Sequence, residues 1–432
     1  MTALLAQRTS AVGVGPSRRP VMGGRRRVRT VSCVVLGVLT TGVAAAAPGP
    51  RKPGDPFSLT LSEQLVHDDN LYRLPGNLEL ADLMPGAQVS RDDLVSRTSA
   101  IVDAGFELGR QAFTLNAAVD GNRYSDNDRL DNTSGNARAD WNWQLMRAWS
   151  GQLGAGYGRS LAGFVNSRFL GKDLLATYDY HGSVRYELTP HWSLLAGAKE
   201  TQGTHDTAAR EIDNFASRSA NFGVRYLTRR GDTLGLQFRR TRTTFPNETA
   251  GASPLLDSRD YLDRAGTFDL AYAFTVKTSF TGSAGYQWRH YPGSVIADFA
   301  GPVWTVALNW SPRAKARVSI TQFQELKAYV DAESSHFEAR GTKLALAWLP
   351  TSTLTLSLET SRETNDYSGF DPLAFAEPAR RDRLQTRQLT LGYAPAQRWT
   401  IELTYRLEKR DTNRIFYQYD DHCVSAALSW VF

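Results

Sequence analysis

Histidines are the side chains best suited to acid–base catalysis, and their spacing in this chain gives catalysis little support. The seven histidines are scattered, at positions 67, 181, 191, 205, 290, 336 and 422. None belongs to an HExxH pair, and there is no GxSxG elbow, GxGxxG or P-loop. His181 with Asp179, and His205 with Asp206, bring a carboxylate near an imidazole and stay candidates for a hydrolytic site. We expect no enzyme, no nucleotide chemistry and no cofactor.

An acidic cluster is the second candidate site. Asp126, Asp128 and Asp131 lie close together in one polar stretch, with Asn127 between the first two. Carboxylate oxygens suit a hard divalent cation, but the spacing is not that of a complete calcium loop. A solvated loop explains the same residues, so we assign no resident metal. Cys33 and Cys423 are the two cysteines of the chain, too few for a multi-cysteine metal site.

Charged residues that recur at every second position form a third set. In residues 400–408 apolar side chains occupy the odd positions and polar or charged ones the even positions. A period of two is typical of a β-strand between two different environments. The polar set predicted to line a water-filled interior is Arg185, Glu187, Arg225, Arg239, Arg289, Glu359, Glu402 and Arg406. Cross-strand charge pairs in a hydrated wall explain these residues, and a polar path for sugar hydroxyls would use the same ones.

The last ten residues show the alternation most clearly. Val424, Ala426, Leu428, Trp430 and Phe432 fall on one face, and mostly small or polar residues fall on the other. In a soluble sandwich the apolar face would point to a core, whereas in a transmembrane barrel it points to lipid. The terminal phenylalanine resembles the signal that the barrel-assembly machinery reads, so we expect that machinery as a partner.

A hairpin unit repeats along the chain from residue 55. Each unit has a strand that ends in an aromatic residue, then a short turn and a second strand. The predicted aromatic girdle is Tyr186, Trp192, Tyr226, Tyr272, Trp310, Trp348, Tyr393, Trp399, Trp430 and Phe432. A propeller with blades of about 40 residues would need four strands per repeat, and each repeat here holds two long ones. Short turns alternating with longer polar loops favour a membrane barrel.

Eighteen strands are expected. Their ranges are 57–66, 98–108, 111–124, 135–146, 150–160, 175–188, 192–203, 217–228, 233–245, 262–274, 278–290, 300–311, 315–328, 338–349, 353–364, 382–394, 398–411 and 418–432. The fold class is therefore all-β, a transmembrane antiparallel up-and-down barrel with short periplasmic turns and longer extracellular loops. The even number puts both chain ends at the periplasmic side and lets the first strand pair with the last, so no edge faces lipid.

The N-terminal segment is expected to be a signal peptide. Residues 1–46 combine arginines with an apolar run, Val31 to Val43, and a small-residue cleavage site before residue 47. The segment holds seven arginines and no acid, so the remaining chain has 43 basic and 44 acidic residues, a net charge near −1. Residues 47–432 would form the barrel in the outer membrane, with a long first outer loop at about 68–97. The basic balance thus gives no argument for nucleic acid.

One segment carries a family resemblance. Residues 54–75 contain His67-Asp68-Asp69-Asn70, an aromatic residue at 72, then Arg73-Leu74-Pro75. This segment resembles the mature N-terminus of the EpsL-like outer-membrane β-barrels of exosortase-B exopolysaccharide loci. The resemblance implies export of exopolysaccharide across the outer membrane, with polysaccharide synthesis and export proteins as partners. The residues alone leave His67 to Arg73 open as a turn that closes the first strand, or as a plug or polymer contact.

Rival functions follow from the same barrel. A general diffusion porin needs the polar lumen and nothing more, and a structural barrel needs a plug, for which residues 68–97 are long enough. Outer-membrane lipid and lipopolysaccharide are expected partners in each case. The identity of the polymer, the direction of transport and the oligomeric state have no signal in the sequence.

Overall fold

The computed structural model describes most of the chain beyond the expected leader. The described residues are 56–86, 88–167, 169–248, 258–292, 298–328, 336–368 and 379–432. They all belong to one compact unit, Ala46–Phe432. The predicted signal peptide, residues 1–46, lies outside the described residues.

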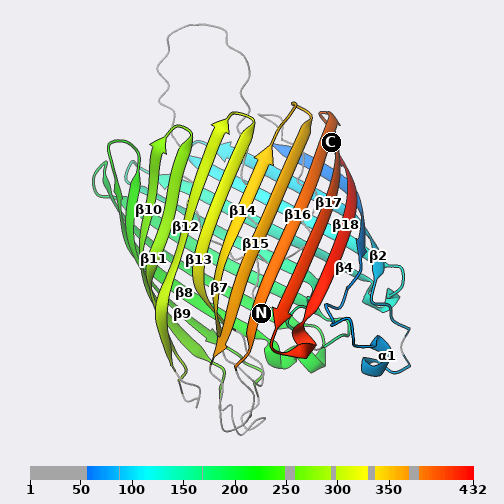
Figure 1. Cartoon of the computed structure of the whole chain (residues 1–432). Helices are drawn as coiled ribbons and strands as arrows, with labels where there is room; N and C mark the ends of the chain where they lie inside the picture. Colours follow the sequence, from blue (N-terminus) through cyan, green and yellow to red (C-terminus); the bar gives the residue numbers. More distant parts are fainter. Residues whose placement is uncertain are drawn as a thin grey trace. The chain divides into compact units, whose positions relative to one another are not determined.

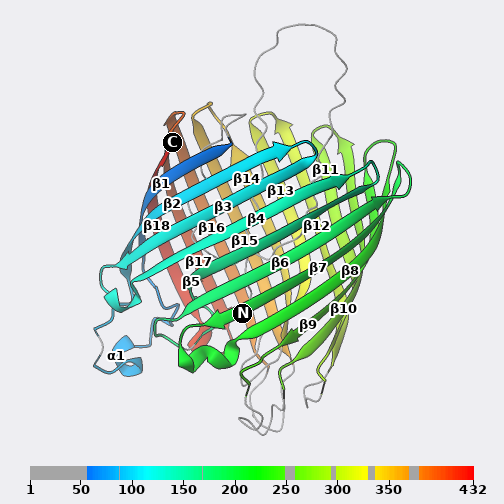
Figure 2. The same ribbon diagram turned by 180° about the vertical axis from the view of Figure 1, so that it is seen from behind.

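Eighteen antiparallel strands form one closed barrel (Figures 1 and 2). The strands are β1 Phe57–Asp68, β2 Asp93–Leu108, β3 Gln111–Tyr124, β4 Asn132–Leu145, β5 Trp149–Leu161, β6 Leu174–Glu187, β7 Trp192–His205, β8 Phe215–Leu227, β9 Thr233–Thr244, β10 Tyr261–Thr275, β11 Thr278–His290, β12 Phe299–Arg313, β13 Ala316–Ala328, β14 His336–Trp348, β15 Leu354–Ser368, β16 Arg381–Ala396, β17 Trp399–Thr412 and β18 Tyr419–Val431. Each strand pairs with its sequence neighbours, and β1 closes the wall against β18. The predicted fold class and strand number are confirmed.

The two ends of the barrel differ in the length of their connections. At the end that holds the C-terminus, two to five residues join consecutive strands, and at the other end six to 24 residues do. Gly109 and Gly231 sit in two of the short turns with φ of +64° and +92°, a backbone region that suits glycine. The short turns and long loops therefore alternate as the sequence predicts.

Exposure separates the two faces of the wall. In β18, Val424, Leu428 and Trp430 are 50%, 45% and 38% exposed, whereas Ser425 and Ser429 are buried. Cross-strand register extends this assignment to every strand, because directly opposed residues share a face. Oily residues thus point out of the barrel and polar ones point in, which no soluble barrel with a filled apolar core would show.

The loop end carries a small apolar layer of its own. Tyr72, Leu74 and Leu80 from the β1–β2 loop pack against Leu130 and Phe164 from the next two loops. The short helix α1, Leu80–Leu83, belongs to this layer and lies beside the barrel rim in Figure 1. Among the described residues, no helix has the length and apolarity to cross a bilayer.

Candidate functional site

A polar network crosses three strands on the inward face. His181 of β6 lies between two carboxylates, with Nε2 3.0 Å from Asp140 Oδ1 and Nδ1 3.5 Å from Asp179 Oδ2. Arg138 Nε donates to Asp140 Oδ2 at 2.8 Å, and the Gln152 amide donates to Asp140 Oδ1 at 2.9 Å. Both histidine nitrogens thus face acids, so the cluster is suited to hold opposite charges in a wet wall. It brings no hydroxyl nucleophile to the imidazole among the contacts of the described residues.

Glycines make room for this network. Gly154 and Gly156 occupy inward positions of β5, the strand between Asp140 and His181. A Cβ on Gly154 would lie 2.3 Å from His181 Cε1 and 2.4 Å from Asp140 Oδ1. A Cβ on Gly156 would lie 2.3 Å from Asp179 Oδ1. The missing side chains let His181 reach across β5 to β4.

A second network closes β1 against β18 at the loop end. Arg73 donates to Asp68 Oδ1 at 2.8 Å and lies 3.0 Å from Asp421 Oδ2, and Arg406 lies 3.4 Å from Asp421. Burial opposes the charge on Arg73, but the two aspartates outweigh it and raise the pKa of the guanidinium. Arg73 adopts a positive φ of 54°, which turns the chain back onto the strand it has just left. The charges here are paired and buried, so the network holds β1 against β18, the strand pair that closes the barrel.

A third network connects one loop with the far side of the opening. Arg410 of β17 lies 2.9 Å from Asp382, which also pairs with Arg380 at 2.8 Å. The same guanidinium group of Arg410 also donates to the carbonyl of Val165 at 2.5 Å and to Asn166 Oδ1 at 2.7 Å. Because β5 and β17 are six strands apart around the wall, the β5–β6 loop reaches over part of the opening.

The predicted lumen residues all occupy inward positions of the strands. They are Arg185, Glu187, Arg225, Arg239, Arg289, Glu359, Glu402 and Arg406. Arg239 and Glu359 are exposed to the interior. Arg185 and Glu187 form an ion pair at 3.5 Å, and both side chains are partly exposed. These residues are spread around the circumference, so they form a mixed-charge wall with no single focus.

Arg289 and His205 have partners that the sequence did not reveal. Arg289 is buried, donates to both oxygens of Asp263 at 2.7 Å and lies 4.1 Å from the ring centre of Tyr261. His205 bonds Asp173 at 2.6 Å, in place of the neighbouring Asp206 that the sequence suggested. Both contacts are buried on the wall and hold strands or loops together.

The motif around residue 70 forms a tight turn at the loop-end rim. Asn70 accepts a hydrogen bond from the Leu74 backbone nitrogen at 3.0 Å and donates its amide to Leu74 and to Asp420 at 2.9 Å. His67 falls on the outward face of β1, while Asp68 falls on the inward face. Asp69 accepts from the His422 backbone nitrogen at 2.7 Å. The motif thus ends the first strand and locks it to the last.

The acidic loop cluster does not converge on a cation position in the described part of the chain. Asn127 is fully buried and accepts from the Tyr72 hydroxyl at 2.8 Å, and Asp131 accepts from the Tyr124 backbone nitrogen. The one convergent acidic group found among the described residues is Asp68, Asp69 and Asp421. Arg73 already lies between two of these three carboxylates, so it supplies the positive charge there.

The predicted girdle residues lie on the outward face around the short-turn end. Trp192 packs on Tyr226 at 4.9 Å between ring centres, and Trp430 contacts both Trp399 at 4.9 Å and Phe432 at 4.4 Å. The others, Tyr186, Tyr272, Trp310, Trp348 and Tyr393, take equivalent outward positions. Aromatic rings at this level are typical of a membrane interface.

Sequence reasoning paired His181 with Asp179 but missed Asp140 and its partners, and it missed the Arg410 contact. A signal for the first exists, because Gly154, Gly156 and Gly158 recur at every second position of one strand, which indicates close approach of neighbouring side chains. No local signal exists for the second, since Arg410 and Asn166 are 244 residues apart.

An apolar outside, a polar inside and a closed wall define an integral membrane β-barrel. The family model described as "Putative beta-barrel porin 2" matches residues 236–431, just under half of the chain. The chain thus has the porin-like fold of an outer-membrane barrel. None of the curated proteins compared with the chain matches it.

Several solved structures are similar to the chain. OpdK from Pseudomonas aeruginosa is 11% identical, with 87% of this chain and 99% of that one covered and a TM-score of 0.47. OccK2 (OpdF) from the same organism, solved with glucuronate, is 10% identical with 87% and 98% covered and a TM-score of 0.48. OccAB3 from Acinetobacter baumannii is 10% identical with 87% and 99% covered and a TM-score of 0.45. Similarities at this level carry no inference about solutes, and the EpsL-like resemblance stays a hypothesis.

Proposed function

We propose that this barrel is a passive channel through which small polar solutes cross the outer membrane. The observation that carries the proposal is the inward face, which carries polar and charged side chains on strands around the circumference, among them the exposed Arg239 and Glu359. Barrels of sixteen to eighteen strands are wide enough to leave an aqueous interior. The alternation of acid and base on that wall gives no strong preference for anions or cations.

The loop end favours small solutes over large ones. The β5–β6 loop, which contributes Phe164 to the apolar loop layer, is tied through Arg410 to β17, six strands from β5 around the wall. A loop held over an opening by hydrogen bonds from a buried arginine narrows the path, since moving it would break the bonds that Arg410 donates to Val165 and Asn166. The proposed cargo is therefore a solute of the size of a sugar or amino acid.

Liposome swelling tests this function. Purified barrel in lipid vesicles is expected to admit mono- and disaccharides, with rates that fall steeply as the solute grows. The matched control is the same vesicle preparation without protein. Vesicles that stay impermeable to every small solute, while the protein is folded by its heat-dependent gel mobility, would contradict a diffusion channel.

Export of an exopolysaccharide is the second candidate, and the His67 to Pro75 segment favours it. That segment supports the idea through its resemblance to polysaccharide-linked barrels, and in this structure it forms the rim turn that holds β1 on β18. A polymer route would need the same hydrated wall, with energy supplied by the synthesis machinery on the other membrane.

Planar-bilayer recording separates the two candidates. A polymer conduit is expected to show long current blocks when the cognate polymer is added. Deleting the gene from cells that still synthesise the polymer should trap polymer in the periplasm. A small-solute channel is expected to show no current block when the polymer is added. Cells that lack the gene should then still carry normal amounts of polymer on their surface. An ionic conductance that the added polymer leaves unchanged would support the diffusion channel.

A further inference from the structure

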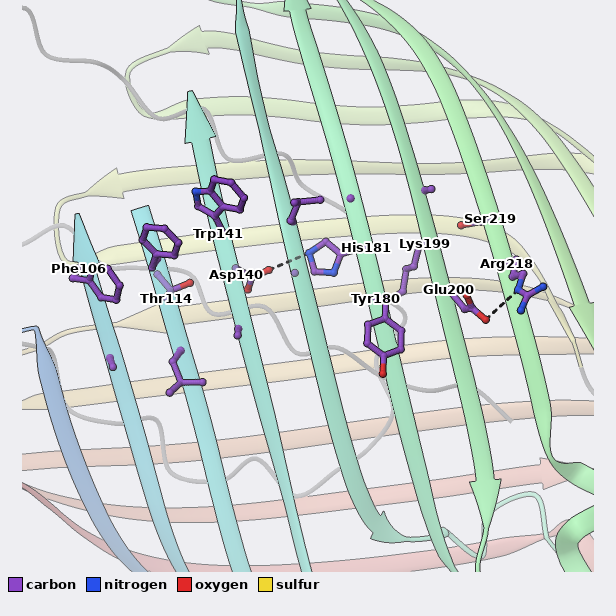
Figure 3. A pocket seen from close by; sticks show the side chains of 18 residues that line it. Phe106, Thr114, Asp140, Trp141, Tyr180, His181, Lys199, Glu200, Arg218 and Ser219 are labelled. Atoms are coloured by element: carbon purple, nitrogen blue, oxygen red, sulfur yellow. Dashed lines mark hydrogen bonds and ion pairs between the residues drawn. The ribbon is translucent and has the colours of Figure 1, made fainter. Parts of the chain in front are cut away.

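An apolar groove follows the barrel wall from β2 to β8; most of its lining residues lie on the outward face, and the inward residues Asp140, His181 and Lys199 also border it. Its volume is about 900 Å³. Its large side chains, all on the outward face, are Phe106, Phe113, Leu115, Trp141, Leu153 and Tyr180. Small residues, among them Ala139, Gly182 and Ala198, leave the space between them. Figure 3 shows the lining spread over neighbouring strands, from Phe106 at one end to Glu200 and Arg218 at the other.

Two rows of directly opposed residues make up this groove. One row runs Phe106, Phe113, Trp141, Leu153, Gly182, Ala198, Ala220, Arg240 and Arg264. The other runs Ala104, Leu115, Ala139, Ala155, Tyr180, Glu200, Arg218 and Arg242. Each row is apolar where it starts, near the short turns, and becomes basic toward the loop end. With strands ~4.8 Å apart, the apolar part of the first row covers roughly 29 Å of wall.

Four arginines gather at the basic end of these rows. Arg218 lies directly opposite Arg242, and Arg240 lies directly opposite Arg264. Like charges directly opposite each other destabilise a strand pair. Arg218 has one carboxylate, Glu200, at 3.0 Å. Among the described residues, no carboxylate forms an ion pair with any of the other three.

The arginine cluster lies at the level expected for lipid head groups. Arg264 is directly opposite Trp288, an outward aromatic residue near the loop end of β11. Tyr226, on the same outward face of β8, marks the girdle at the other end, eight residues from Arg218. Eight residues of a strand tilted by about 40° rise roughly 20 Å, close to the apolar band of such barrels, ~25 Å.

We propose that this groove and arginine cluster bind one phosphorylated, multi-chain lipid of the outer leaflet, of the lipid A kind. Acyl chains lie in the part of the groove next to the arginine cluster, and head-group phosphates lie among Arg218, Arg240, Arg242 and Arg264. Phosphate supplies the negative charge that opposed arginines need, and guanidinium groups bind it through paired hydrogen bonds. The site requires the barrel to be in the outer membrane and is independent of what crosses the lumen.

The decisive comparison uses two triple variants of equal charge. The test variant is R240Q/R242Q/R264Q, and the control is R362Q/R383Q/R387Q. The control arginines also face outward near the loop end and, like the test set, form no ion pair among the described residues, but they do not line the β2–β8 groove. Binding of purified lipid A to the full barrel in a neutral detergent would be measured by native mass spectrometry and titration.

The test variant is expected to bind lipid A on the order of 100-fold more weakly, since each arginine near an anionic lipid surface contributes about fivefold. The control variant is expected to keep the affinity of the unmodified barrel. Equal losses in both variants would reduce the site to general charge attraction and overturn the proposal. Unchanged binding in the test variant would overturn it as well.

A second variant tests the groove without touching charge. A139W/A198W places two large rings in the apolar space, where both alanines are exposed on the outer face, so folding is not at risk. This variant is expected to bind lipid A more weakly, while its affinity for inorganic phosphate stays that of the unmodified barrel. If the filled groove instead abolishes a dimer of the barrel and leaves lipid A binding intact, the groove is an interface between copies and the proposal fails.

Discussion

At the scale of single residues, absent side chains matter as much as present ones. Gly154 and Gly156 leave the space in which His181 reaches Asp140 across an intervening strand. The alternating glycines are visible in the sequence, but their partners are set by strand register. Register depends on the pairing of all the strands. The sequence therefore predicts the space beside the glycines, but it does not predict which side chains occupy that space.

Gly154→Ala is expected to destabilise the barrel by about 1–3 kcal/mol, because the new methyl group overlaps His181 and Asp140 and breaks their contact. Thermal unfolding followed by heat-dependent gel mobility measures the loss. Gly266→Ala is the matched control, since a Cβ there meets no heavy atom within 4 Å. The double variant Gly154→Ala with His181→Ala should recover part of the loss, and a double variant worse than the sum of its parts would contradict this account.

Tyr72 gives the loop layer a pH dependence. Burial raises the pKa of its hydroxyl above the ordinary 10.0, so the protonated form that donates to Asn127 is favoured in the packed loop. The stabilisation is full below pH 10 and is lost as the pH rises through the higher pKa of the packed state. The protection of backbone amides in residues 69–86 and 88–92, taken relative to their intrinsic exchange rates at the same pH, is expected to fall above pH 10.

Tyr72→Phe should remove about 1 kcal/mol from loop packing at neutral pH and flatten its alkaline response. Tyr157→Phe is the control, because Tyr157 lies on the outward face and stacks on Tyr178. An alkaline loss of protection that persists in Tyr72→Phe would assign the effect to another group.

At the scale of elements, the strands were predictable and the loops were not. Period-two alternation located all eighteen strands within a few residues, since each strand must place apolar side chains toward lipid and polar side chains toward water. The β5–β6 loop carries no such pattern. Its position depends on Arg410, a residue 244 positions away, so only the folded wall determines it.

Arg410→Ala is expected to release the β5–β6 loop and raise single-channel conductance, with more frequent current fluctuations in planar bilayers. Asn166→Ala removes the same contact from the loop side and should shift the current in the same direction. Lys409→Ala, on the opposite face of β17, is the control and should leave conductance unchanged. Identical traces for Arg410→Ala and the unmodified barrel would show that the loop does not limit the path.

At the scale of the whole molecule, the main feature is that the apolar face of the wall points outward and the polar face points inward, the reverse of a soluble barrel. The sequence predicts a membrane barrel because polar and apolar faces alternate over many long strands and because the interior of so large a barrel is too wide to fill. What passes through the barrel has no such signature, because mixed charges on a wall suit many solutes. The paired charges at the seam and mouth became visible only with the closed structure.

A cysteine accessibility scan of residues 400–407 in β17 tests the central claim most directly. Each position is replaced in a Cys423→Ser background, reconstituted in vesicles and exposed to a water-soluble thiol reagent and to a lipid-soluble quencher of a thiol-attached probe. We predict that the even positions react from water and that the odd positions, including Leu403 and Tyr405, are quenched from lipid. The reverse pattern, or equal reaction at neighbouring positions, would contradict a barrel whose oily face meets the membrane.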